Sequence, residues 1–152
     1  MFKGEFPASE LNLQPGHKYK LHIQGKHGDW FDRIPAYARY CLQDPDNHSF
    51  SGCHFESEYE MSQNKPNFNE SLKIYECHVG MSSPEAKIAT YKEFTETTLP
   101  FIKSMGYNAI QLMAVPEHAY YGSFGYHVTN YFASSSRFGT PDDLKKVSNF
   151  FL

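Results

Sequence analysis

The sequence predicts short β-strands in its first half and a strand–helix–strand unit of a parallel sheet in its second half. Residues 18–23 alternate polar and apolar side chains, residues 90–105 space apolar side chains by three and four, and residues 109–115 form an apolar run. These patterns are typical of a strand with one buried face, an amphipathic helix and a strand buried on both faces. The 152 residues allow one domain or two small ones, but they exclude a complete eight-stranded α/β barrel, which needs at least ~200 residues.

Further strands and a linker complete the expected first half. A turn-rich segment at residues 24–29 separates the first strand from a second one at residues 30–34, which predicts a hairpin. Another short strand is expected at residues 38–42. The polar residues 43–70 contain proline and glycine and predict a linker that crosses a surface.

The second half begins with a strand at residues 73–80, which Gly80 ends. The apolar face of the following helix comprises Tyr91, Phe94, Thr98, Ile102 and Met105. Pro100 should kink this helix or remove one backbone hydrogen bond, and Gly106 suits the position just beyond its C-terminus. Strand, helix and strand together predict one right-handed βαβ unit.

A long aromatic loop and a second helix follow. Residues 116–139 are dense in Tyr, Phe and Gly and are expected to form a loop. Thr140 is typical of a helix N-cap, Pro141 fits the first helical position, and the carboxylates of Asp142 and Asp143 face the positive end of the helix dipole. These residues predict a helix that starts directly after Thr140.

Composition and charge exclude several classes of protein. The 14 Lys and Arg against 17 Asp and Glu give a net charge of −3, with no block of like charges to bind nucleic acid or an anionic membrane. Cys41, Cys53 and Cys77 are odd in number and widely spaced, which supports neither a disulfide framework nor a zinc site and favours a reducing compartment. The sequence holds no secretory h-region and no apolar window of ~20 residues. A cytoplasmic protein without nucleic-acid or membrane partners is therefore expected.

The candidate site lies where the predicted parallel strands end. Ligands of parallel α/β proteins bind at the carboxyl ends of the strands, and here that edge carries residues 78–80 and 117–126. The aromatic rings of the second segment can lie flat against a sugar, and they equally fit an ordinary packed loop. Glu76 and His78 share one face of the first strand. They are better interpreted as a hydrogen-bonded pair than as metal ligands, because no third ligand is spaced to complete a site.

Four blocks of the sequence resemble a known family. They read IYECHVG (74–80), YNAIQLM (107–113), EHAYYGSFGY (117–126) and ASSSRFGTP (133–141). In this order and with these gaps they are similar to the glycogen and starch branching enzymes, the 1,4-α-glucan branching enzymes of the α-amylase superfamily. More loosely, residues 11–40 resemble the last strands of the β-sandwich carbohydrate-binding module that precedes the barrel in that family.

The resemblance implies three segments: residues 1–42 as the C-terminal strands of a carbohydrate-binding β-sandwich module, residues 43–72 as a linker, and residues 73–152 as the start of a truncated (β/α)8 (TIM) barrel. It also implies retaining transglycosylation, in which a carboxylate nucleophile forms a covalent glucosyl-enzyme and a Glu serves as acid/base. The family carries both groups on later strands, which places them beyond Leu152. This chain is therefore expected to hold no catalytic residue and to be inactive alone. No cofactor and no metal site are expected.

The resemblance also implies which residues contact a glucan. Tyr126 matches the residue that stacks beneath the sugar at the cleavage point, against the alternative of a core Tyr. His127 stands where the family commonly has Gln, and Glu117 and His118 match positions beside the site, where they are expected to brace the loop. Four N-terminal residues align with glucan-contacting positions of the module, although a hairpin turn and a surface Arg explain them equally well. These four are Gly16, His17, Lys18 and Arg39.

The leading hypothesis is a fragment of a branching enzyme, with an α-glucan (glycogen or starch) as its partner and the cytoplasm, or the plastid of a starch-making plant, as its location. The alternative is a non-catalytic glucan-binding protein. A small metal protein built on the eight His is weaker, because the chain has neither H-E-x-x-H nor a Cys/His pair at zinc spacing. Residues 146–148 can be encoded by an exon end followed by a splice donor, so residues 147–152 are expected to be translated intron.

Overall fold

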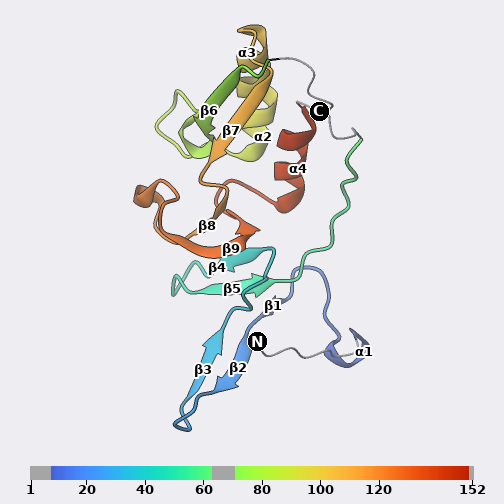
Figure 1. Ribbon diagram of the computed structural model, residues 1–152. Helices are drawn as coiled ribbons and strands as arrows, with labels where there is room; N and C mark the ends of the chain where they lie inside the picture. The colour runs from blue at the N-terminus through green and yellow to red at the C-terminus, as the bar shows by residue number, and fades with distance from the viewer. Residues whose placement is uncertain (1–7, 63–70, 151–152) are drawn as a thin grey trace.

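The computed structural model describes residues 8–62 and 71–150. Figure 1 shows a β-rich N-terminal part below a helix-covered pair of parallel strands, with β8 and β9 between them. The first part holds α1 (Ala8–Leu11), β1 (Lys18–Tyr19), β2 (Leu21–Gln24), β3 (Trp30–Arg33), β4 (Cys41–Gln43) and β5 (Phe50–Cys53). The second holds β6 (Ile74–His78), α2 (Tyr91–Glu93), α3 (Leu99–Ser104), β7 (Ala109–Met113), β8 (Pro116–His118), β9 (Val128–Ser134) and α4 (Pro141–Phe150).

The predicted hairpin is confirmed, but its predicted buried face is wrong. β2 pairs antiparallel with β3, from Leu21 opposite Arg33 to Gln24 opposite Trp30. The apolar side chains of β2 stay in solvent, with Leu21 47% and Ile23 37% exposed. Alternation shows that a strand has an apolar face, but it does not show that anything within the described residues covers that face.

The predicted linker contains a strand that the sequence pattern missed. β5 lies inside residues 43–70 and is the middle strand of the antiparallel sheet β1–β5–β4. Gly52 is required there because the ring of Tyr19 lies 2.7 Å from the position of a Cβ on residue 52. A glycine weakens the strand signal of the sequence, and here it marks the close approach of a ring.

The βαβ unit is confirmed. β6 and β7 are parallel, and Tyr75 lies opposite Ile110. Burial of β7 on both faces is wrong for this chain, because its residues are half-buried and Gln111 is exposed. Ile110 and Leu112 pack against the main core.

The helix between these strands contains a π-helical turn that explains how it accommodates Pro100. The turn η2 (Phe94–Thr98) lies between α2 and α3, and Pro100 occupies the first turn of α3. A π turn inserts one extra residue per turn, so Leu99 becomes fully buried five positions after Phe94. Met105, predicted on the apolar face, is 44% exposed, because it lies just beyond the end of α3 at Ser104.

The aromatic segment predicted as one loop contains a pair of strands. β8 and β9 are antiparallel with register shifts at both steps of β8. The helix after it begins as predicted: the Thr140 hydroxyl accepts a hydrogen bond from the Asp143 N–H (3.2 Å), and the Asp143 carboxylate accepts one from the Thr140 N–H (3.1 Å). The Thr140 cap is confirmed.

The last helix extends into the residues expected to be translated intron. α4 continues through Val147 to Phe150, and the Val147 side chain is fully buried in the main core. Phe151 and Leu152 lie outside the described residues. A fold does not show how residues are encoded, so the intron interpretation of residues 147–152 stays a prediction. So does the placement of the catalytic carboxyl groups beyond Leu152.

The core lies between the parallel strands and the helices that cover them. The buried residues of the main cluster all come from the second half of the chain. A smaller cluster of Ala38, Cys41 and Ala133 joins that half to the N-terminal sheet. The main cluster comprises Val79, Tyr91, Phe94, Leu99, Ile102, Phe138 and Val147. Among the described residues, no helix has the length and apolar character needed to cross a membrane.

Candidate functional site

The aromatic loop, residues 119–127, lies at the carboxyl end of β7 (Figure 1). Directly after β7, Ala114 adopts a φ of 58°. Gly125 in the loop adopts a φ of 86°, and a Cβ on it would lie 2.4 Å from the Cβ of Ala114. Glycine permits both this backbone conformation and this close approach. The contact holds the loop at the edge where parallel α/β proteins bind ligands.

The loop presents Tyr126 to solvent. Tyr126 is 77% exposed, so it is not a core residue. Its backbone N–H donates to the carbonyl of Ser123 (3.0 Å), and the N–H of His127 donates to the Ser123 hydroxyl (3.4 Å). His127 is exposed as well, with its ring centroid 6.5 Å from that of Tyr120. The two sequence candidates Tyr126 and His127 therefore share one accessible surface.

Glu117 and His118 lie on β8 and are buried, at 1% and 0% exposed. The carboxylate of Glu117 accepts hydrogen bonds from the N–H of Ser136 (2.8 Å) and from the N–H of His118 (3.1 Å). The His118 Nδ1–H donates to the carbonyl of Pro116 (3.0 Å), since a carbonyl can only accept. These contacts brace β8 against the turn at Ser136.

A buried aromatic cluster lies behind the loop, here called the Phe138 cluster (His78, Tyr91, His118 and Phe138). Phe138 is 1% exposed. Its ring centroid lies 5.6 Å from His78, 5.7 Å from Tyr91 and 5.8 Å from His118. The cluster joins the end of β6, the start of the helix and β8. Sequence reasoning missed it because the four residues come from segments far apart in the chain.

The interpretation of Glu76 and His78 as a hydrogen-bonded pair is wrong. The Glu76 carboxylate accepts a hydrogen bond from the Gln111 side chain (3.1 Å), whereas His78 belongs to the Phe138 cluster. Across residues 8–62 and 71–150 no group of three His, Cys, Asp or Glu side chains is placed to hold a metal ion. The parallel register that brings Gln111 opposite Glu76 could not be read from the single strand.

The Phe138 cluster makes stability depend on pH. Burial lowers the pKa of His78 below its usual value, and the neighbouring His118 lowers it further. The neutral ring is therefore favoured in the folded state. We expect the neutral His78 ring to make its full contribution to the free energy of unfolding above the unfolded-state pKa of about 6.5. This free energy should decrease as the pH falls from there through the lower folded-state pKa. Urea midpoints near pH 7.5 and near pH 5 should show this loss, and H78Q should reduce it. An unchanged pH dependence in H78Q would show that another group is responsible.

The N-terminal candidates lie away from the aromatic loop. Gly16, His17 and Lys18 lie at or next to β1, and β5 and β4 separate β1 from the bridge between Tyr40 and Ser134 on β9. The Gly16 N–H donates to the carbonyl of His54 (2.8 Å), and the Lys18 ammonium lies 4.0 Å from the Asp44 carboxylate. The structure does not bring these three residues to the loop.

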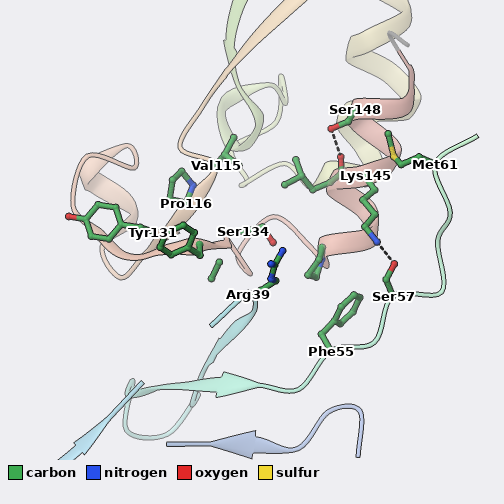
Figure 2. Close-up of a pocket in the computed structure, with 14 residues that line it drawn as sticks. Arg39, Phe55, Ser57, Met61, Val115, Pro116, Tyr131, Ser134, Lys145 and Ser148 are labelled. Carbon is green, nitrogen blue, oxygen red and sulfur yellow. Dashed lines mark hydrogen bonds between the residues drawn. The ribbon is translucent and has the colours of Figure 1, made fainter. Parts of the chain in front are cut away.

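Arg39 lines a separate cavity of about 540 Å³. Figure 2 shows its guanidinium beside Ser134, with Phe55 and Met61 on the side formed by residues 55–61 and Lys145 on α4. The eight candidates from the sequence thus fall into three places. Arg137 was missed: its guanidinium donates to the carbonyl of Ala119 (3.0 Å) and anchors the start of the loop.

Comparison with solved structures defines the class of fold. A provisionally named alpha amylase from Salmonella typhimurium superposes with a TM-score of 0.70 at 22% identity, covering 92% of this chain and 23% of that chain. The fold of the chain is therefore that of part of an alpha amylase-like protein. No family model matches the sequence.

Sequence comparison with curated proteins gives a more specific result than the comparison of folds. The chain is 46% identical to the 1,4-alpha-glucan-branching enzyme of Equus caballus over 93% of its length, and 52% identical to that of Aspergillus oryzae over 86%. It is 64% identical to the Saccharomyces cerevisiae enzyme of the same name over 60% of its length. These matches confirm the resemblance to branching enzymes that the sequence blocks indicated. The chain spans only 14–20% of the length of these three relatives.

Proposed function

We propose that the chain is a fragment of a 1,4-α-glucan branching enzyme, which cuts an α-1,4 glucan and rejoins the cut segment to a 6-hydroxyl. Residues 1–42 contribute strands of a carbohydrate-binding module, residues 43–72 the connection that includes β5, and residues 73–152 the first βαβ unit of the barrel. The identity to branching enzymes and the fraction of their length that is matched support this assignment. A cytoplasmic or plastid location belongs to the same proposal.

The observation that carries the substrate assignment is the exposed Tyr126 at the carboxyl edge of β6 and β7. Its ring can stack on a sugar because it is exposed to solvent. The contact of Gly125 with Ala114 fixes the loop in advance, which lowers the entropic cost of binding. His127 shares the exposed surface and can add a polar contact. Glu117 and His118 support the loop from within.

The chemistry requires groups that the family carries beyond the position of Leu152. Retaining transglycosylation uses two carboxyl groups roughly 5–5.5 Å apart on either side of the scissile bond. Glu117, the carboxylate next to the loop, is buried and already accepts hydrogen bonds from two backbone N–H groups. It can therefore neither attack a glucan nor protonate one in this arrangement. We propose that the chain alone binds glucan and does not branch it.

Co-sedimentation with glycogen tests the proposal. Tyr126→Ala should lower the affinity about fivefold, because ring stacking contributes roughly 1 kcal/mol. Phe101→Ala is the matched control, since Phe101 is 61% exposed but lies on α3, at the opposite end of β7 from the aromatic loop (Figure 1). The iodine absorbance of the glucan should not change in any sample.

Two outcomes would contradict different parts of the proposal. Equal losses in both variants would remove Tyr126 from the substrate site. Branching by the pure chain would show that its own residues supply the chemistry. The non-catalytic glucan-binding protein remains the alternative, and it predicts the same binding without any catalytic role in a longer protein.

A further inference from the structure

A segment without helix or strand is tied along α4 by polar contacts. This segment, residues 57–62, is called the strap. The carboxylate of Asp142 accepts three hydrogen bonds from it, from the Ser57 hydroxyl (2.5 Å), the Glu58 N–H (3.0 Å) and the Tyr59 N–H (3.2 Å). Further along, the Ser62 N–H donates to the side chain of Asn149 (3.2 Å). One carboxylate thus holds the start of the strap.

Ser57 is the centre of this attachment. Its hydroxyl contacts the ammonium of Lys145, as Figure 2 shows, and it also donates to the Asp142 carboxylate. Lys145 in turn pairs with Asp142 (3.2 Å). Ser57 is nevertheless exposed, and it lies in the sequence F-E-S-E-Y-E. Its neighbours Glu56 and Glu58 and the later Glu60 are also exposed. An accessible hydroxyl in an extended acidic segment complements the basic substrate groove of an acidophilic protein kinase.

We propose that Ser57 is a phosphorylation site for an acidophilic serine/threonine kinase and that its phosphorylation releases the strap from α4. In the reaction, the Ser57 oxygen attacks the γ-phosphorus of ATP and forms a P–O bond. The bond from that phosphorus to the bridging oxygen of ADP breaks, and the hydroxyl proton passes to a base of the kinase. The inference does not depend on the proposed glucan chemistry.

Release follows from charge. Phosphorylation removes the hydroxyl donor and adds a charge of about −1.5 to −2 directly beside the Asp142 carboxylate. Lys145, the cation at this point, is already shared between Ser57 and Asp142, and Glu56 and Glu58 add further negative charge. Like-charge repulsion at hydrogen-bond distance therefore opposes the attachment. Since Ser57 and Met61 of the strap line the Arg39 cavity, release of the strap opens that cavity.

The test treats the full chain with casein kinase 2 and Mg-ATP and maps the phosphate by mass spectrometry. We expect one phosphate, on Ser57, because the other serines and threonines with an acidic side chain three positions later, Ser82, Thr90 and Thr140, are half-buried and lie at turns or helix caps. Ser62 is an internal control, because it lies in the same strap but lacks the acidic residue three positions later that Ser57 has in Glu60. E60Q should slow the reaction about tenfold. D142N should accelerate it severalfold, because the attached strap and the kinase compete for Ser57.

Hydrogen exchange measures the release itself. Phosphorylation should accelerate exchange of the Glu58 and Tyr59 amides about tenfold or more, while amides of β6 and β7 keep their rates and report that the fold is intact. Phosphate on another residue, no phosphate, or unchanged exchange at Glu58 and Tyr59 in the phosphorylated chain would each overturn the proposal.

Discussion

Gly125→Ala is expected to lower the free energy of unfolding by about 2–5 kcal/mol. A Cβ at this position would lie 2.4 Å from the Cβ and 2.5 Å from the Cα of Ala114, so backbone must move. Such overpacking costs roughly 1–3 kcal/mol. The φ of 86° adds roughly 1–2 kcal/mol for any residue with a Cβ. Urea unfolding followed by far-UV circular dichroism measures the loss.

Gly106→Ala is the matched control for this variant. Gly106 has nearly the same φ, 84°, but nothing lies within 4 Å of a Cβ built on it. It should therefore lose only the conformational part, roughly 1–2 kcal/mol. Equal losses in the two variants would show that Gly125 does not hold the aromatic loop against β7. If the contact positions Tyr126, G125A should also weaken glycogen binding while G106A leaves it unchanged.

Phe138→Ala should have the largest effect on stability, a loss of about 3–5 kcal/mol. The ring is 1% exposed and contacts His78, Tyr91 and His118, so its removal leaves a cavity where three segments meet. Thermal and urea unfolding of the two proteins measure the difference.

Phe101→Ala is the matched control, because it makes the same amino-acid change on α3 at a side chain that is 61% exposed. Its effect should stay within about 0.5 kcal/mol. If F138A does not fold, F138L keeps most of the volume and should lose only about 1–2 kcal/mol. A small effect of F138A would mean that the Phe138 cluster does not hold the second half of the chain together.

Local signals predicted the elements that local chemistry determines. The N-cap at Thr140 and the glycine Gly106 after the helix each act within a few residues. The alternation in residues 18–23 indicated extended structure, but the structure divides it into β1 and β2, which belong to different sheets. β5 was missed because Gly52 weakens its strand signal. The pair β8–β9 was missed because its register is irregular. Pro100 was recognised as a disturbance, but the π turn that absorbs it could not be derived from a period of 3.6.

The functional roles of the candidate site residues stay predictions, but the structure shows where each of these residues lies. Tyr126 and Glu117 followed from the ordered blocks of the resemblance, and the structure places both on the β8–β9 segment at the carboxyl edge. Arg137 and the Phe138 cluster were missed, because their contacts depend on that strand pair. Gly16, His17, Lys18 and Arg39 aligned in sequence, yet the fold distributes them over two other places.

The exposed hairpin β2–β3 determines what fluorescence can report. The single tryptophan of the chain, Trp30, is 57% exposed and stacked on His22 at 4.7 Å. Because Trp30 lies outside both buried clusters, its emission follows the hairpin and not the packing around Phe138. A difference between the fluorescence and circular dichroism transitions would therefore measure directly how strongly the N-terminal strands are coupled to the βαβ unit.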